Sequence, residues 1–355
     1  MGSGEQRYRL VCEAELPGSE IVHFAEGDHR ITSHYNRVVV ERDGKRTEVA
    51  LPEPVWRRPL GWSRLARRAL RLDKCNVVPV GESRQNLVIL RQGIVYHYDG
   101  QSGALTPTLR LCNCRNVLHQ SIAMLDGHEI VFGEYGANPE FRSVPVYKSD
   151  DGGRTWRVAL NFQAHRTRHV HGCYWDPHAR QFWVFTGDFD GEVQVLRADR
   201  DFQNVEWLGD ATQAWRAVAA FFTPEAVYWL MDSPLEPNYL VRFDRRTGRI
   251  EKKGEQLPGP VWYCKETSDA FYLAATACEV GPGVLDAAAH VLVSHDLEHW
   301  SEAAAFAWDG WPKGYFKFGV VGFADGRQSS RDFYLFFEAL RGLDGRAWRC
   351  LLEES

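Results

Sequence analysis

Residues 149–156 read Ser149-Asp150-Asp151-Gly152-Gly153-Arg154-Thr155-Trp156 and follow the strand-like segment 144–148. A carboxylate at Asp151 can accept hydrogen bonds from the amides of a tight turn, and glycine allows the left-handed backbone that such turns require. The ring of Trp156 can then pack under the hairpin at the start of the next strand. The octet therefore predicts a tight turn between two antiparallel β-strands.

The same pattern of strand, Asp-led turn and strand recurs along the chain at intervals of 45 to 56 residues. The turns are led by Asp43, Asp99, Asp150, Asp199, Asp244, Asp296 and Asp344. Apolar runs such as 86–90 and 182–185 lie between the turns and are typical of short strands. Repeats of about fifty residues are typical of four-stranded propeller blades. We therefore predict an all-β, seven-bladed β-propeller in a single domain over residues 1–355, with six blades as the alternative.

Composition supports the all-β interpretation and narrows the classes of partner. The 355 residues include 13 Trp, 13 Tyr, 19 Phe and 31 Gly against 3 Met, which favours aromatic strands joined by turns. No apolar run reaches the roughly 20 residues of a membrane span. A net charge of −5 provides no general basic surface for phosphates. We predict neither a membrane nor a nucleic-acid partner and leave the oligomeric state open.

The eight cysteines are scattered, and none forms the Cys-x-x-Cys pair of a structural zinc site. Scattered thiols in a chain of this size are typical of reduced proteins. The N-terminus also lacks the apolar core of a secretory signal. We therefore expect free cysteines and a cytoplasmic protein. A secreted or periplasmic location is the alternative if a signal segment originally preceded Met1.

One segment has a helical pattern, at residues 62–72, where four arginines lie along one side. A charged stripe of this kind is typical of a solvated helix face. We interpret residues 57–73 as a basic surface insertion in the propeller.

The octet resembles the Asp-box, or bacterial neuraminidase repeat, of the sialidase superfamily, Ser-x-Asp-x-Gly-x-Thr-Trp. The matching residues are Ser149, Asp151, Gly153, Thr155 and Trp156. Residues 294–300 resemble a degenerate copy. The resemblance implies a sialidase-like propeller in which the box is a structural turn on the face opposite the active site. The Arg-Ile-Pro segment that supplies the first arginine of the sialidase triad is absent, so the resemblance does not extend to the catalytic pattern.

Propeller topology directs attention to the face away from the Asp-led turns, where innermost strands begin and second strands end. The segments expected to begin innermost strands lie around His23, Asn76, His119, His169, Arg216, Tyr263 and Tyr315. Second strands are followed by acids at Glu134, Asp188, Asp190, Asp232, Glu279 and Glu338. An acid at this point in five successive blades indicates a ligand-binding face.

Chemical roles follow from the residue types. The catalytic candidates are Glu134, Asp188, Asp190 and Asp232 as acid and base, His169 for proton transfer, and Tyr263 as a sialidase-style nucleophile. The substrate-binding candidates are Arg142, Arg166, Arg168, His119, His171, Arg216, Glu279, Trp262, Tyr315 and Lys317. Because side chains alternate along a strand, His169 and His171 are expected to point to the same side.

These residues favour a carbohydrate-active enzyme, a glycoside hydrolase that cleaves a glycosidic bond in an anionic or polyhydroxylated glycan. One alternative is a polysaccharide or oligouronate lyase that uses His169 or His171 with Tyr263 or Lys317 for β-elimination. Another is a non-catalytic propeller that binds a glycan or a protein. We predict no cofactor. A divalent metal at His119, His169 and His171, with Asp188 or Glu134 completing the shell, is the alternative.

Overall fold

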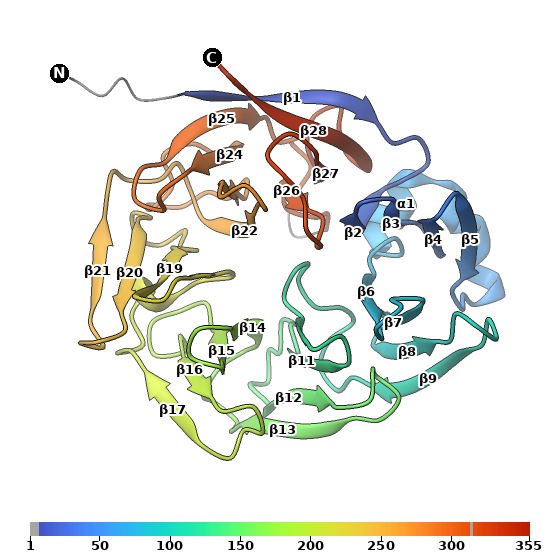
Figure 1. Cartoon of the computed structure of the whole chain (residues 1–355), viewed down its shortest axis with the longest axis horizontal. Helices are drawn as coiled ribbons and strands as arrows, with labels where there is room; N and C mark the ends of the chain where they lie inside the picture. The colour runs from blue at the N-terminus through green and yellow to red at the C-terminus, as the bar shows by residue number, and fades with distance from the viewer. Residues whose placement is uncertain (1–6, 313–314) are drawn as a thin grey trace. The chain divides into compact units, whose positions relative to one another are not determined.

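The computed structural model describes residues 7–312 and 315–355 of the chain. The strands form seven sheets, each with four strands, which Figure 1 colours in chain order. Paired strands run antiparallel, as in the sheet of the octet. The fold is the predicted all-β, seven-bladed β-propeller of four-stranded blades, and the six-bladed alternative is wrong. The chain divides into two compact units, and the single-domain interpretation stays a prediction.

Unit 1 comprises residues 1–73, 234–238 and 253–355 and contains three sheets. The first consists of β2 (Ile21–Glu26), β3 (His29–His34), β4 (Arg37–Arg42) and β5 (Lys45–Ala50). The second consists of β22 (Val261–Glu266), β23 (Tyr272–Thr276), β24 (Ala289–Ser294) and β25 (Ser301–Phe306). The third orders β1 (Tyr8–Glu15), β28 (Arg346–Glu354), β27 (Phe333–Glu338) and β26 (Val320–Phe323). Its edge strand β1 therefore comes from the opposite end of the chain, as Figure 1 shows.

Unit 2 comprises residues 74–233 and 239–252 and carries the other four sheets, apart from the last residue of β21. The first two consist of β6 (Asn76–Val80), β7 (Asn86–Arg91), β8 (Ile94–Tyr98) and β9 (Leu105–Arg110), and of β10 (Ala123–Leu125), β11 (Glu129–Gly133), β12 (Val144–Ser149) and β13 (Arg157–Phe162). The last two consist of β14 (Val170–Asp176), β15 (Gln181–Thr186), β16 (Val195–Ala198) and β17 (Val205–Leu208), and of β18 (Phe221–Phe222), β19 (Ala226–Leu230), β20 (Leu240–Asp244) and β21 (Ile250–Lys253).

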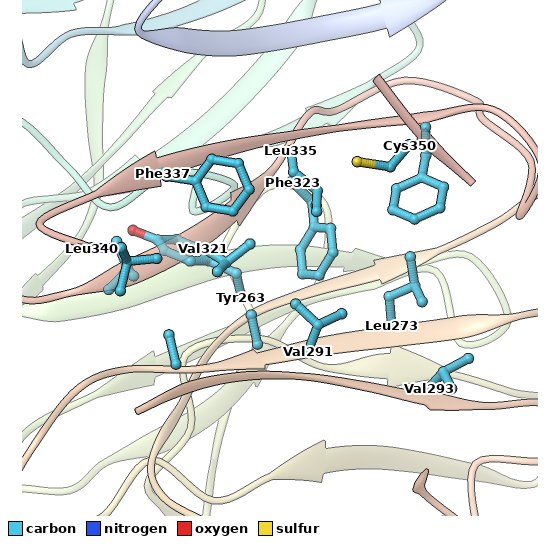
Figure 2. Packing of buried hydrophobic residues seen from close by; sticks show 14 of the residues in the cluster. Tyr263, Leu273, Val291, Val293, Val321, Phe323, Leu335, Phe337, Leu340 and Cys350 are labelled. Carbon is cyan, nitrogen blue, oxygen red and sulfur yellow. The ribbon is translucent and has the colours of Figure 1, made fainter. Parts of the chain in front are cut away.

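Each unit has its own apolar core between neighbouring sheets. In unit 1, a cluster that includes Leu273, Val291, Phe323 and Leu335 fills the space between the sheet of β22 and the sheet of β26 (Figure 2). In unit 2, the run from Phe182 to Phe185 in β15 is buried throughout. Strands covered on both faces need continuous rather than alternating apolar sequence, which explains such runs.

The octet forms the predicted turn between β12 and β13. Asp151 Oδ1 accepts hydrogen bonds from the amides of Arg154 and Thr155 at 3.0 and 2.9 Å. Its Oδ2 accepts a bond from the Thr155 hydroxyl at 2.7 Å. Gly153 has a φ of +83°, and a Cβ there would lie 2.3 Å from a methyl of Val88, so glycine is required. The degenerate copy makes a similar turn, in which Asp296 accepts a bond from the His299 amide at 2.8 Å.

The helical pattern at 62–72 corresponds to the 3-10 helix η1 (Val55–Trp62) and to α1 (Arg64–Leu70), whereas unit 2 has the short 3-10 helix η2 (Gln213–Trp215). None of the helices in the described parts of the chain has the length and hydropathy needed to cross a bilayer.

The arginines of α1 do not form the exposed basic stripe that the sequence suggested. Arg67 and Arg68 are buried, 6% and 4% exposed, and pair with Glu20 and Asp309. Ion pairs with acids from other parts of unit 1 hold these guanidinium groups inward. The exposed side chains of the segment instead include Trp62, Leu65 and Leu70.

Candidate metal centre

His169, just before β14, and His171, within it, point to the same side as predicted, and the strand is bulged at this point. Val170 pairs with Thr186, whereas Gly172 pairs with Phe185, so His171 is the extra residue of a β-bulge. Bulges redirect side chains and occur frequently beside functional sites.

The acid that follows β15 completes a compact cluster with the two histidines. The Nε2 atoms of His169 and His171 lie 3.1 Å apart. Asp188 Oδ1 lies 3.4 Å from the first and 3.3 Å from the second. Among the described residues, these three form the group whose ligand atoms all lie within 4.8 Å of one another. Asp188 is one of the two acids predicted to complete the shell, whereas His119 and Glu134, the other predicted ligands, are not part of this group.

The opposite nitrogen of each ring is held by a backbone carbonyl. His169 Nδ1 lies 2.8 Å from the Gly136 oxygen, and His171 Nδ1 lies 3.0 Å from the Ala217 oxygen. Because a carbonyl oxygen only accepts hydrogen bonds, we assign the hydrogen to Nδ1 in both rings. In the neutral rings both Nε2 atoms then carry lone pairs directed at each other and at the Asp188 carboxylate. Three acceptors in contact require a proton or a cation between them.

The spacing of these atoms matches the edges of a metal coordination shell. Metal bonds of about 2.0–2.1 Å in tetrahedral geometry place ligand atoms roughly 3.3–3.4 Å apart. The three separations in the cluster are 3.1, 3.3 and 3.4 Å. Metal-bound histidines usually donate their second ring hydrogen to a carbonyl or carboxylate, as both do here.

Burial and charge favour the protonation states in which these side chains can bind a metal ion. Burial lowers the pKa of His171, against an opposing hydrogen bond from Asp188, and so favours the neutral imidazole. Burial alone would raise the pKa of Asp188, but hydrogen bonds and charge from His169 and His171 hold it well below its usual range. A neutral imidazole and an ionised carboxylate are the forms that bind metals.

Arg216 contacts the acid of this cluster. Its Nη1 donates to the Asp188 backbone oxygen at 2.6 Å, and its Nη2 lies 3.2 Å from Asp188 Oδ1. Its Nε donates to Asp232 Oδ2 at 3.3 Å, and the Asp232 side chain is buried. The candidates Arg216 and Asp232 therefore position Asp188.

Sequence reasoning missed two groups around the centre. The ring of Tyr135 lies 4.4 Å from the His169 ring. Gln213 is fully buried and donates to the Asp188 backbone oxygen at 3.3 Å and to Asp190 Oδ1 at 3.2 Å. Tyr135 directly follows Glu134 in the predicted ligand face and was therefore recognisable. Gln213 lies in η2, a helix that no periodic pattern predicts.

Glu134 occupies the predicted strand end, where it holds a neighbouring loop. Its two carboxylate oxygens accept bonds from the amides of Cys112 and Asn113 at 2.6 and 2.7 Å, and Tyr147 Oη donates to it at 3.0 Å. The side chain is 1% exposed. The contacts of Glu134 are thus those of a structural carboxylate.

The remaining unit 2 candidates lie in varied surroundings. Arg168 pairs with Glu192 at 3.1 Å, and its guanidinium lies 4.4 Å from the centre of the Phe141 ring. Arg142 and Arg166 are outside the His169 cluster: Arg142 is 63% exposed and pairs with Glu140, and Arg166 is exposed.

Five candidates belong to unit 1. Tyr263 is 1% exposed within the core of Figure 2, a burial that the nucleophile role did not anticipate. Trp262 donates its indole hydrogen to Glu279 at 3.0 Å, and Tyr315 is 79% exposed. Lys317 is also buried, and it pairs with Asp73 at 3.0 Å and with Glu338 at 2.6 Å. Their predicted substrate roles stay predictions.

Comparison with known proteins identifies the fold but no family. No family profile and no curated protein matches the chain. The solved structure of Ycf48 bound to D1 peptide is 12% identical, with a TM-score of 0.55 over 98% of this chain and 96% of that one. Ycf48 from Cyanidioschyzon merolae is 11% identical, with a TM-score of 0.56 over 97% and 99%. The WD40 propeller domain of Doa1 is 12% identical, with a TM-score of 0.54 over 100% and 98%. Identities this low show a shared propeller fold alone.

Proposed function

We propose that this propeller binds a divalent transition-metal ion through Nε2 of His169, Nε2 of His171 and Oδ1 of Asp188. The proposal is carried by the convergence of three lone-pair atoms, with both Nδ1 atoms fixed as donors to carbonyls. Two imidazoles and one carboxylate suit Zn²⁺ or another first-row divalent ion. Three protein ligands leave a coordination position for water or an exogenous ligand, as in catalytic rather than structural zinc sites.

The predicted carbohydrate-active function is the proposed use of this centre, and the lyase form is favoured. A cation with an open position attracts a carboxylate, and neutralising that group makes the neighbouring C–H more acidic. The hydrolase form needs two carboxyl groups free to act as acid and base. Asp188, Asp232 and Glu134 are instead each engaged by neighbouring groups. An acidic glycan is therefore the proposed substrate class.

Metal titration tests the proposal directly. The full chain, stripped with a chelator, is titrated with Co²⁺ and followed by visible absorption, and bound Zn²⁺ is counted by elemental analysis. We expect one ion per chain. His169→Gln and His171→Gln should each weaken binding by about 100-fold or more. Each removes a direct ligand, and loss of an outer-shell partner alone typically costs about 10–100-fold.

His290→Gln is the matched control. His290 is also buried and lies 2.6 Å from Glu302 and 3.4 Å from Asp286, but it belongs to unit 1 and has no second histidine in its cluster. This variant should bind the ion as the wild type does. Failure of the wild type to bind Co²⁺, Zn²⁺ or Mn²⁺ at one equivalent would overturn the proposal. If the loaded protein binds acidic oligosaccharides and releases no ultraviolet-absorbing unsaturated product, the binding propeller replaces the lyase.

A further inference from the structure

The sheet that joins the two ends of the chain places two cysteines directly opposite each other. In the antiparallel pair β1 and β28, Cys12 is the partner of Cys350. The Ser355 amide donates to the Arg7 oxygen at 3.0 Å, which makes Arg7 and Ser355 a hydrogen-bonded pair. Bonded and non-bonded pairs alternate along an antiparallel ladder. Counting from Arg7, Cys12 and Cys350 form a non-hydrogen-bonded pair.

This position has the spacing of a disulfide. Opposite residues in a non-hydrogen-bonded pair have Cα atoms about 4.5 Å apart, and their side chains approach most closely. Disulfides span Cα separations of about 4.4–6.8 Å. The two side chains lie on one face of the sheet, because partners in a ladder share a face. The charge of Cys12 also contributes, after burial, to raising the pKa of Cys350, as expected for neighbouring thiols.

The two thiols differ in access to solvent. Cys350 is fully buried in the unit 1 core, and Figure 2 shows it among the apolar side chains of that cluster. Cys12 lies on the edge strand and is exposed. All eight cysteines of the chain are free thiols. Cys12 can therefore meet an oxidant from solution, whereas the buried Cys350 lies directly opposite Cys12 in the ladder.

We propose that Cys12 and Cys350 are a redox pair whose disulfide links β1 covalently to β28. The Cys12 thiolate attacks a low-molecular-weight disulfide such as oxidised glutathione, which gives a mixed disulfide and releases one glutathione thiolate. Cys350 then loses its proton and attacks the Cys12 sulfur, which releases the second glutathione. The protein loses two protons and two electrons, and the glutathione disulfide gains them and is reduced to two thiols. Excess thiol reverses both steps.

The link closes nearly the whole chain into one loop. A disulfide across so long a loop removes much of the entropy of the unfolded chain. It also fixes the edge strand β1, which is otherwise held to β28 by hydrogen bonds and side-chain packing. Oxidation should therefore stabilise unit 1 and leave its fold unchanged.

The test is oxidation of the full-length protein with oxidised glutathione, followed by peptide mapping without reduction. We expect a Cys12–Cys350 peptide and a rise in Tm of roughly 3–8 °C that excess dithiothreitol removes. Cys12→Ser should abolish both effects. Because Cys12 is exposed, the variant should keep the native fold, which circular dichroism checks. Cys350→Ala provides the second variant if it folds.

Cys112→Ser is the matched control because Cys112 is the other exposed thiol. This variant should still form the linked peptide and show the same rise in Tm. A stable glutathione adduct on Cys12 with Cys350 still reduced would refute the proposal. An equal rise in Tm for Cys12→Ser would do the same, since the stabilisation would then come from another site.

Discussion

Individual side chains at the centre of unit 2 show where sequence reasoning succeeds. His169 and His171 could be assigned to one side of a strand because their spacing has a period of two. The ring orientations could not be predicted, because the carbonyls that fix them belong to Gly136 and Ala217, which other segments supply. Asp188 was among the predicted ligands, but the exclusion of His119 could not be predicted, because tertiary structure decides which side chains converge.

Lys265 provides a prediction at the residue scale. Its ammonium group is buried and donates to the backbone oxygens of Ala324 and Gly326 at 2.8 and 3.0 Å. Burial lowers its pKa to about 8, although Asp325 and Glu26 oppose the shift. An unfolded lysine titrates near pH 10.4, so the unfolded chain binds more protons between about pH 8 and 10.4. The free energy of unfolding should therefore increase as the pH rises through this window.

Lys265→Met removes the titrating group. The difference in stability between the wild type and this variant therefore isolates the contribution of Lys265 from that of other titrating groups. The stability of the wild type relative to Lys265→Met should increase by an amount on the order of 3 kcal/mol between pH 7.5 and 10.5. Urea unfolding of both proteins at several pH values measures the difference. A gap between the two proteins that stays constant over this range would contradict the lowered pKa.

Among the structural elements, the turns were the most useful for predicting the fold from the sequence. The octet and the other Asp-led turns predicted the number of blades. Each turn needs the same residue types, so the turn recurs in the sequence each time the blade is repeated. The helix α1 was predicted only in outline: its pattern indicated a helix, but the acids that draw Arg67 and Arg68 inward lie at Glu20 and Asp309. Ion pairs between such distant positions leave no periodic signal.

The octet turn itself should be a local determinant of stability. Asp151→Ala removes the acceptor for two backbone amides and for the Thr155 hydroxyl. Unsatisfied turn amides and lost charge-assisted bonds should cost about 1–3 kcal/mol of unfolding free energy. Denaturant unfolding of the variant measures this loss.

The adjacent acid is the control for that measurement. Asp150 is 55% exposed and pairs with Lys148 at 2.9 Å, and Lys148 keeps its partner Glu129 at 3.0 Å when Asp150 is removed. Asp150→Ala should therefore cost less than about 1 kcal/mol. Equal losses for Asp150→Ala and Asp151→Ala would show that the turn hydrogen bonds are not what stabilises the octet.

At the scale of the whole molecule, the pairing of the two chain ends in one sheet determines when folding can be completed. The sheet of β26, β27 and β28 acquires its fourth strand only when β1 adds to β28. Such non-local pairing must overcome a large loop-closure entropy before its contacts form. The repeat pattern alone did not reveal it, because the first and last units of the sequence are too degenerate to show which of them lacks a strand.

Tyr8 should be the side chain that contributes most to holding β1 in this sheet. It is 7% exposed, and its ring lies 5.2 Å from both Phe271 and His295, so it connects β1 to the neighbouring blade of unit 1. Tyr8→Ala should lower the unfolding free energy by about 3 kcal/mol or more, because it leaves a cavity between two sheets. Arg9→Ala, the neighbour that is 65% exposed and pairs with Glu353, should cost less than about 1 kcal/mol. Urea unfolding distinguishes the two, and equal small losses would mean that β1 is held by its ladder hydrogen bonds alone.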